Sequence, residues 1–343
     1  MKKKTTIKDV AKHAKVSPAT VSYVLNGVKK VSEKTKKRVL DAVEELNYYP
    51  DFAAVNLSKR TSNLIGVVLP AAEESMFEHN AYYNEFVGGI ELVARLNNFD
   101  TLITGEGNIE GLSQWVKKRN LDGLIYMGLF PEESSAELKA LNVPTVLIDA
   151  YGEYTEYFNN VNIDDERGGY LATKHLIALG HENIAFVATN INLSPVDYLR
   201  YQGYQKALKE AGLSHDVGLL FEVETISFEK GKSIGEVMLE SQHAFSGIVT
   251  VSDILAFGII KAFYQNHLHV PTDYSIIGFD DLSISQYSIP SLTTVRQNIF
   301  GKGKTAAQLI LDLIKSTAKK NKCIKLPVEL IERESTTRYD VKN

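Results

Sequence analysis

Residues 6–27 read TIKDVAKHAKVSPATVSYVLNG and residues 46–57 read LNYYPDFAAVNL, and these two stretches decide how the chain begins to fold. Thr6 and Asp9 have the three-residue spacing of a reciprocal cap, which predicts a helix that begins after Thr6. Pro18 marks the first position of a second helix, because the N–H group that proline lacks would have no partner there. Only about two residues separate these helices, which is the spacing of a helix-turn-helix.

Apolar side chains recur at helical spacing through this part of the chain. A third helix, capped by Ser32, should follow the first two. The residues expected to form a shared core are Ile7, Val10, Ala11 and Ala14 in the first helix, Val21, Val24, Leu25 and Val28 in the second, and Thr35, Val39, Val43 and Leu46 in the third. The pattern therefore predicts a small three-helix head.

The second helix of this head presents an outer face that suits DNA. In a helix-turn-helix, the N-terminal residues of the second helix reach base edges in the major groove. Pro18 and Ala19 offer apolar contact to thymine methyl groups, and Tyr23 offers a hydroxyl group and a ring. Hydroxyl and amide side chains suit phosphates, which set register. The candidate DNA-binding residues in the head are Thr6, Ser17, Pro18, Ala19, Thr20, Ser22, Tyr23 and Asn26.

Charge is distributed unevenly along the chain. Residues 1–60 hold 14 Lys and Arg against 6 Asp and Glu, a net of +8, whereas the whole chain carries −4. A basic end on an otherwise acidic protein predicts a polyanionic partner for that end. The alternative is a solvated, lysine-rich helical bundle without a partner, but the helix spacing favours nucleic acid.

These residues resemble the LacI/GalR family of bacterial transcription regulators. The resemblance is carried in the head by Asp9-Val10-Ala11, Val16 to Ser22, Leu25-Asn26-Gly27, Val31-Ser32, Leu46-Asn47-Tyr48 and Pro50 to Leu57. It continues through Gly180 to Phe186, Arg200 to Tyr204, Ser252 to Ala256, Ile277 to Asp281 and Pro290 to Val295. Two positions depart from the family pattern. Tyr23 stands where the family usually has an Arg or His that reads guanine, and Asp51 replaces the usual Asn.

The segment after the head resembles the family's hinge helix. Asp51 can cap a short helix that runs to about Ser58, too short to be stable alone in water. The resemblance implies that this helix forms only on operator DNA, where it pairs with its twin from a second subunit. Ala54 is small enough for close approach, and Leu57 is the candidate wedge that kinks the duplex from the minor groove. The alternative makes Leu57 an ordinary linker residue.

Length and composition set the broad class. The chain has 343 residues, 44% of them hydrophobic, which is enough for two or three packed domains. Its apolar runs are short for a membrane span, and no apolar signal-peptide core follows the N-terminal lysines. The single cysteine, Cys323, cannot form an internal disulfide, which is typical of a reducing compartment. We therefore expect a cytoplasmic protein.

From Leu64 onward, buried-strand runs alternate with helical patterns. Strands are expected over 64–69, 100–104, 123–127, 145–149, 184–188, 219–223, 248–251 and 275–279, with helices over 82–96, 110–119 and 132–141 and between the later strands. A strand beginning at Val161 is expected to open the second set. Continuous apolar runs separated by helices predict doubly wound parallel sheets covered on both faces. The resemblance implies a periplasmic-binding-protein-like, two-lobed body.

We therefore expect three parts in the chain. They are an all-α head over 1–49, a hinge helix and linker over 50–61, and an α/β body over 62–343. The body is divided into lobe 1, about 62–160 and 292–321, and lobe 2, about 161–291 and 322–343. The chain should cross between the lobes near 160, 291 and 321.

Ligands of such sheets lie beyond the carboxyl ends of the strands. The resemblance places Arg200, Asp253 and Asp280 in a cleft on the second lobe and Asn80, Tyr82 and Tyr83 on the first. Carboxylates and Arg can bond adjacent hydroxyls, and aromatic faces pack on sugar rings, so a saccharide is the leading effector. The two tyrosines could instead be helix-start packing, and Arg200 with Asp280 could be a structural ion pair.

Rival chemistries have weaker support. Residues 298–305 approach a phosphate-binding loop, but Asn298 replaces its first glycine. Ser227 and Lys230 match S-x-x-K without its companion motifs. The eight His residues lack ligand spacing, so we expect no metal site and no cofactor.

The sequence thus predicts a ligand-controlled, DNA-binding transcription regulator, most simply a repressor, that acts as a homodimer and is not an enzyme. The alternative is a cytosolic sugar-binding protein or sugar-modifying enzyme. Release and promotion of DNA binding by the effector both stay open.

Overall fold

The computed structural model describes residues 5–25, 27, 31–48, 61–70, 80–105, 109–128, 135–315 and 321–339. Asn26, Val28, Ala54, Leu57 and the expected hinge helix lie outside these ranges. The chain divides into two compact units, residues 1–63 and 64–343, and each is described by itself.

The first unit is the predicted helical head. Its helices are α1 (Ile7–His13), α2 (Pro18–Leu25) and α3 (Glu33–Glu45). The Asp9 carboxylate accepts from the Thr6 backbone N–H at 2.8 Å, and the Ser32 hydroxyl caps α3 by accepting from the Thr35 N–H at 3.3 Å. The buried core, which holds the helices together, comprises Val10, Ala11, Ala14, Val21, Val24, Val39, Ala42 and Tyr48.

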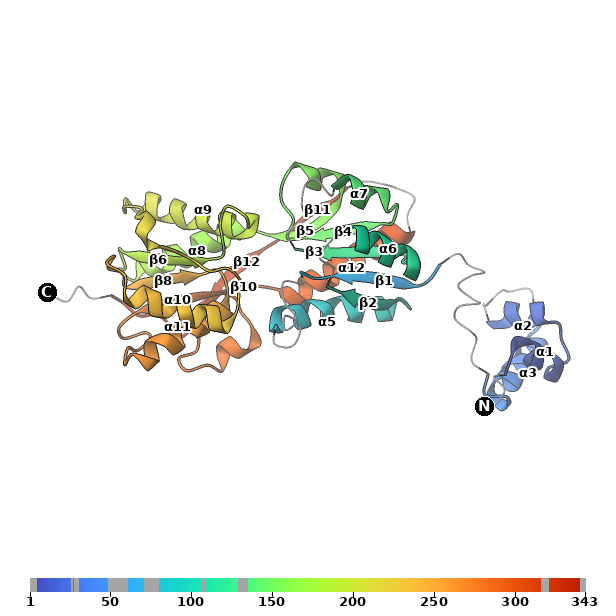
Figure 1. Cartoon of the computed structure of the whole chain (residues 1–343). Helices are drawn as coiled ribbons and strands as arrows, with labels where there is room; N and C mark the ends of the chain where they lie inside the picture. Colours follow the sequence, from blue (N-terminus) through green and yellow to red (C-terminus); the bar gives the residue numbers. More distant parts are fainter. Residues whose placement is uncertain are drawn as a thin grey trace. The chain divides into compact units, whose positions relative to one another are not determined.

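Lobe 1 of the second unit is built on a six-stranded sheet in the order β11-β5-β4-β3-β1-β2. Its strands are β1 (Leu64–Val68), β2 (Asp100–Thr104), β3 (Gly123–Met127), β4 (Thr145–Ile148), β5 (Asn159–Ile163) and β11 (Cys323–Leu326). Every pairing in it is parallel. The helices are α5 (Ala81–Leu96), α6 (Ile109–Arg119), α7 (Ser135–Ala140) and α12 (Ile299–Lys315). Separate apolar clusters join α5 and α12 to one face of the sheet and α6 and α7 to the other (Figure 1).

Lobe 2 has a second six-stranded sheet in the order β12-β10-β9-β8-β6-β7. Its strands are β6 (Ile184–Ala188), β7 (Leu220–Glu222), β8 (Gly247–Thr250), β9 (Ser275–Asp280), β10 (Thr293–Gln297) and β12 (Val328–Ile331). The helices are α8 (Asp165–Ala178), α9 (Pro195–Glu210), α10 (Phe228–Leu239) and α11 (Asp253–Gln265), with 3-10 turns η2 (Glu153–Tyr157), η3 (Val217–Leu219) and η4 (Ser283–Gln286) along the body. Strand β12 runs antiparallel to β10, and the other pairings of this sheet are parallel, as predicted.

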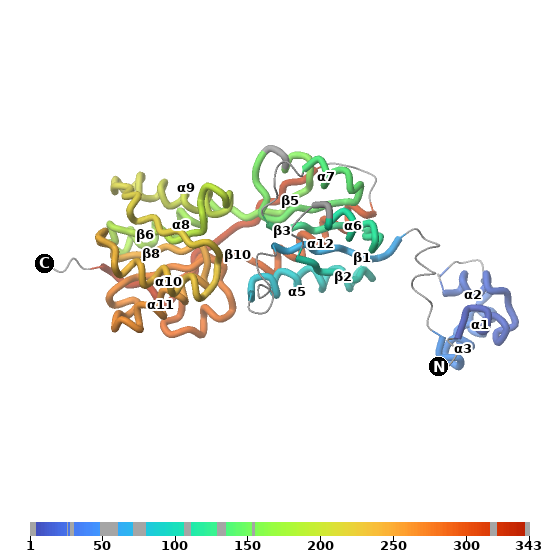
Figure 2. Tube along the Cα trace, viewed as in Figure 1, coloured from blue at the N-terminus to red at the C-terminus, as the bar shows by residue number. Residues whose placement is uncertain are grey.

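The chain crosses between the lobes a few residues later than the sequence predicted. Strand β5 belongs wholly to the first sheet, β10 to the second, and β11 again to the first. The crossings therefore follow Ile163, Gln297 and Leu326, in place of positions near 160, 291 and 321. A strand bonds to one sheet along its length, so the chain can change lobes only at a strand end. Figure 2 traces the third crossing, the red segment from β11 to β12.

Apolar runs explain the two cores of the body. Inner strands such as β1, β4, β6, β8 and β9 are apolar and buried on both faces, as expected for sheets covered by helices. The edge strands β2, β7, β11 and β12 are partly exposed. Apolar contacts join the lobes. Leu282, which precedes η4 in lobe 2, is buried within the lobe 1 cluster of α5 and α12, and Ile254 of α11 packs against the same cluster. Among the described residues, no helix is both long and apolar enough to cross a bilayer.

Candidate functional site

The predicted DNA-facing surface of the head is exposed. Ser17 caps α2, since its hydroxyl accepts from the Thr20 N–H at 3.1 Å, and this fixes where the helix begins. Pro18 and Ala19 follow on the surface, and the Tyr23 side chain is 50% exposed one turn later. Thr6 and Ser17 are exposed, whereas Thr20 and Ser22 are half-buried. The N-terminal turn of α2 is therefore free of the core, as a recognition helix requires.

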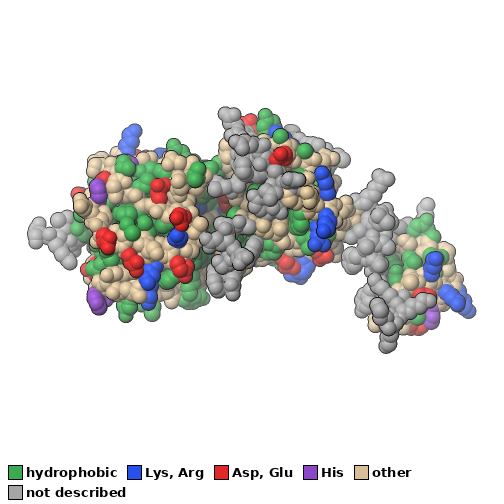
Figure 3. Space-filling model, in the orientation of Figure 1, with side chains coloured by type: hydrophobic (Ala, Val, Ile, Leu, Met, Phe, Trp, Pro, Cys, Tyr) green, Lys and Arg blue, Asp and Glu red, His purple; other side chains and the backbone are tan. Residues whose placement is uncertain are grey.

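Basic side chains surround this surface without being part of the core. The exposed lysines and arginine of the described head are Lys8, Lys12, Lys15, Lys34, Lys36, Lys37 and Arg38. Figure 3 shows basic side chains on the visible face of the head. Such charges attract the phosphate backbone without reading sequence.

Polar side chains of the body gather where parallel strands end. Asp149 follows β4, Asp165 follows β5 and opens α8, Asp280 ends β9, and Gln297 ends β10. The backbone turns sharply at two of these ends, where Asp149 has φ 52° and Asp280 has φ 117°. Positive φ at non-glycine residues costs conformational energy and concentrates at functional sites.

A buried ion pair forms the lobe 1 side of this polar region. The Lys302 ammonium on α12 donates to both Asp149 carboxylate oxygens, at 2.9 and 3.0 Å, and to the Tyr82 hydroxyl at 3.1 Å. Tyr82 in turn donates to Asp149 at 3.2 Å. The Lys302 side chain is only 1% exposed. The three groups form a closed polar cluster between β4, α5 and α12.

A second buried ion pair forms the lobe 2 side. Arg200 Nε on α9 donates to Asp165 Oδ1 at 2.8 Å, and Arg200 Nη1 donates to the Val251 carbonyl at 2.7 Å. The guanidinium lies 3.6 Å from the centre of the Phe279 ring. The hydroxyl of Tyr151, which follows β4, donates to the other Asp165 oxygen and so links the two lobes. Arg200 thus pairs with Asp165, and not with Asp280 as the structural alternative held.

Asp280 lies between these two pairs. Burial raises the pKa of its carboxyl to about 8, although Arg200 lowers that pKa and Asp253 raises it further. Gln297 Nε2 donates to Asp280 Oδ1 at 2.6 Å. Gln297 Oε1 is buried and has no hydrogen-bond partner within the part of the chain that the structure describes. A buried acceptor without a donor is costly, so this atom is a natural contact for a ligand hydroxyl.

The tyrosines show that groups of both lobes meet in one place. Burial raises the pKa of Tyr83 to about 12, and Asp149 of lobe 1 and Asp280 of lobe 2 raise it further. Burial also raises the pKa of Tyr82, again with contributions from both carboxylates. The two rings pack edge to face with centroids 5.7 Å apart. Arg200, Asp280, Tyr82 and Tyr83 are therefore brought together, as an interlobe cleft requires.

The side chains of two of the expected effector residues, Asp253 and Asn80, form hydrogen bonds within the fold. The Asp253 carboxylate is fully buried and accepts from the Leu282 N–H, the Ser285 hydroxyl and the Thr294 hydroxyl. The Asn80 side chain caps α5 by accepting from the Tyr83 N–H at 3.3 Å. Their contact with a ligand stays a prediction.

Sequence reasoning missed Asp149, Asp165, Lys302, Tyr151 and Gln297. Asp149 follows β4 directly and Asp165 lies two residues after the end of β5, and these positions could have identified them. Lys302 lies in the stretch that was rejected as a phosphate loop, and nothing in that stretch indicates burial.

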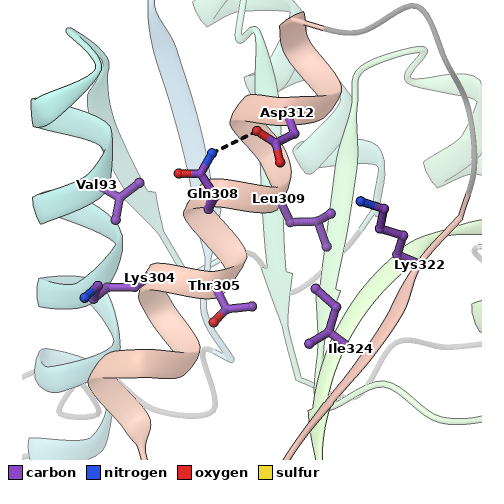
Figure 4. Close-up of a pocket in the computed structure, with 8 residues that line it drawn as sticks. All are labelled: Val93, Lys304, Thr305, Gln308, Leu309, Asp312, Lys322 and Ile324. Atoms are coloured by element: carbon purple, nitrogen blue, oxygen red, sulfur yellow. Dashed lines mark hydrogen bonds between the residues drawn. The ribbon is translucent and has the colours of Figure 1, made fainter.

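A separate hollow of about 380 Å³ lies on the surface of lobe 1 between α5, α12 and β11. Lys304, Gln308 and Asp312 on α12 and Lys322 beside β11 line it, and Gln308 donates to Asp312 at 2.8 Å (Figure 4). It shares no lining residue with the polar cleft. In the part of the chain that the structure describes, no cluster of three or more His, Cys, Asp or Glu side chains could hold a metal ion.

The chain matches two protein-family models and many known proteins. Residues 6–51 match the bacterial regulatory proteins of the lacI family, and residues 173–336 match a periplasmic binding protein-like domain. The chain is 35% identical to the HTH-type transcriptional regulator RegA of Clostridium saccharobutylicum over 97% of its own length and 99% of that protein. It belongs to the lacI family of bacterial transcriptional regulators. The expected resemblance is thus confirmed.

Solved structures of this family show the same fold. The lac repressor dimer bound to operator and the anti-inducer ONPF superposes with a TM-score of 0.86 at 28% identity, covering 98% of this chain and 100% of that one. A lacI-family regulator from Enterococcus faecium with bound ribose gives a TM-score of 0.72 at 32% identity, covering 81% and 100%. The two-lobed architecture and the helix-turn-helix head are confirmed as lacI-family features.

Proposed function

We propose that this lacI-family protein is a transcriptional repressor whose binding to a pseudo-palindromic operator is controlled by a small ligand in the interlobe cleft. The observation that carries the proposal is the joint presence, in one chain, of an exposed α2 N-terminus and a cluster of buried polar side chains at the strand ends of the two lobes. The head supplies contacts to bases and phosphates. The cleft supplies carboxylates, a guanidinium and tyrosine rings.

A sugar suits the groups in the cleft. Asp280 and Gln297 offer hydrogen-bond acceptors, Arg200 offers donors, and Tyr82 and Tyr83 offer aromatic faces for the apolar side of a ring. The solved relative with bound ribose supports this choice. The protein would then act as a cytoplasmic DNA-binding protein without a catalytic role, and the relative named as an HTH-type transcriptional regulator supports this assignment.

Two copies of the chain would bind one operator. A pseudo-palindromic site mirrors the two-fold symmetry of a dimer, and the solved lac repressor is a dimer on its operator. The ligand would change the relation between the lobes only as far as it binds one arrangement more tightly than the other. In the segment 50–61, which the sequence assigns to the hinge, two copies would pair only in the DNA-binding arrangement.

Fluorescence anisotropy with a labelled pool of pseudo-palindromic duplexes tests the proposal. We expect binding that weakens steeply with added salt, because phosphate contacts release counterions. D-ribose and other sugars should then change the affinity for the selected duplex and leave that for a scrambled duplex unchanged. Absent or salt-insensitive DNA binding, or a strictly monomeric protein in sedimentation, would overturn the proposal.

A further inference from the structure

Lys302 is a buried cation whose hydrogen-bonding capacity is already used. Its ammonium contacts Asp149 Oδ1, Asp149 Oδ2 and the Tyr82 hydroxyl, all within 3.1 Å. An ammonium has three N–H donors, and these three contacts match that number. A ligand anion would therefore have to displace Asp149 in order to reach this charge.

Arg200 is committed in the same way. It pairs with Asp165 at 2.8 Å, donates to a main-chain carbonyl at 2.7 Å and covers the Phe279 ring. Its side chain is 8% exposed and that of Asp165 is fully buried. Its remaining N–H groups could donate to a ligand oxygen, but its charge is balanced by Asp165.

The third carboxylate of the cleft lacks a cation of its own. Among the described residues, the contact of Asp280 within hydrogen-bond distance is the Gln297 amide, and Asp280 forms no ion pair. Both buried cations are therefore already paired with a carboxylate, and neither is free to pair with an incoming anion. Gln297 Oε1, which has no hydrogen-bond partner among the described residues, adds a further acceptor beside Asp280.

We propose that the effector is an uncharged polyhydroxy compound, a sugar or polyol and not a sugar phosphate, and that Lys302 sets this specificity by neutralising Asp149. The inference rests on the proposed ligand-controlled function. A neutral hydroxyl group can donate to Gln297 Oε1 and to Asp280. A phosphate or carboxylate would be desolvated without a free cation to pair with it, which is unfavourable in a buried site.

The ion pair between Asp149 and Lys302 allows the preference for neutral ligands to be changed by single substitutions. Without Asp149, the Lys302 ammonium would be free to attract an anion. Without Lys302, Asp149 would lose its counter-ion, and the site would bind even neutral ligands less well because a buried charge would be left unpaired. Removal of both side-chain charges, those of Lys302 and Asp149, would leave the net charge of the site unchanged.

Matched ligand pools test the charge preference directly. Thermal shift of the full-length protein is measured with a pool of neutral sugars and polyols and with a pool of their phosphorylated counterparts, followed by calorimetry of each active pair, beginning with D-ribose and D-ribose 5-phosphate. We expect the neutral member to bind at least about 100-fold more tightly, as the burial of an anion without a counter-ion implies. An equal or stronger response to the anionic pool, or no response to the neutral pool, would overturn the inference.

Variants of the ion pair test the role of Lys302. Asp149→Asn should narrow the preference for the neutral member by about tenfold or more, because the ammonium loses its counter-ion. Lys302→Met should weaken binding of the neutral ligand, and Lys302→Met combined with Asp149→Asn should recover part of the loss. Lys304→Met, on an exposed lysine of the same helix, is the matched control and should change neither value.

If the Lys302–Asp149 pair served folding alone, Asp149→Asn would lower the thermal midpoint of unfolding but would leave unchanged the ratio of the affinities for the neutral and the anionic ligand. That result would reject the specificity role of Lys302. DNA binding of the same preparations, measured without ligand, keeps this outcome apart from a failure of the proposed function. An effector that is anionic would leave the regulator assignment standing while removing the inference.

Discussion

Replacement of Asp253 by Ala tests whether this carboxylate holds the loop that joins the lobes. Asp253 is fully buried at the start of α11, and its oxygens accept from Leu282 N at 2.8 Å, Ser285 Oγ at 2.6 Å and Thr294 Oγ1 at 2.6 Å. These contacts fix the segment that carries Leu282, and Leu282 packs in the lobe 1 core. Asp253→Ala therefore removes three bonds and loosens an interlobe contact.

The magnitude follows from the three donors that the substitution leaves behind. An unsatisfied buried donor costs about 1–3 kcal/mol. The two hydroxyl groups can rotate toward other acceptors, but the Leu282 N–H cannot, so we expect a total loss of about 3–5 kcal/mol in the free energy of unfolding. Asp253→Asn should cost only about 1 kcal/mol, since its oxygen keeps two donors and its NH₂ group can donate to Thr294.

Urea unfolding followed by tryptophan fluorescence measures this difference, because Trp115 is the single tryptophan of the chain. Calorimetry of the folded variants against the neutral sugar pool gives the second readout. If Asp253→Ala unfolds within about 1 kcal/mol of the unchanged protein but no longer binds ligand, Asp253 contacts the effector and the positioning role is refuted.

Two more predictions concern the cleft and the hinge. Because the pKa of Asp280 is about 8 in the folded protein against an ordinary 3.8, the folded state keeps a proton that the unfolded state loses, and stability should fall as pH rises from about 4 through about 8. Asp280→Asn should flatten this fall by several kcal/mol in unfolding experiments across that window, with an upper limit of about 6 kcal/mol because about four pH units at about 1.4 kcal/mol each separate the two pKa values. An unchanged slope would contradict the raised pKa. Leu57→Ala should weaken specific operator binding roughly tenfold to 100-fold in anisotropy titrations while non-specific binding stays within about twofold. Equal losses on both DNAs would remove the wedge assignment.

The head illustrates how much local sequence can predict. The starts of α1, α2 and α3 follow from Thr6, Pro18 and Ser32, and the core follows from side chains spaced three and four residues apart. Caps and helical periodicity act within one or two turns, so they are written in adjacent residues. The expected body strands likewise lie within one or two residues of the observed ones, because a buried strand needs a continuous apolar run.

Local sequence patterns did not predict which of the two lobes a strand belongs to. An apolar run indicates that β5 or β10 is buried, but it does not indicate which sheet the strand joins. That choice depends on partners such as β4 for β5 and β9 for β10. The sequence placed both strands in the wrong lobe for this reason.

The sequence by itself determined the family, the helix-turn-helix and the position of Arg200, Asp280, Tyr82 and Tyr83 near the ends of two sheets. Tertiary structure decided which charges are paired. Lys302 and Asp149 lie 153 residues apart and meet only when α12 packs beside β4, and Asp253 finds its three partners 29 to 41 residues away. Ion pairing depends on distance and burial in space, and neither quantity is encoded by neighbouring residues.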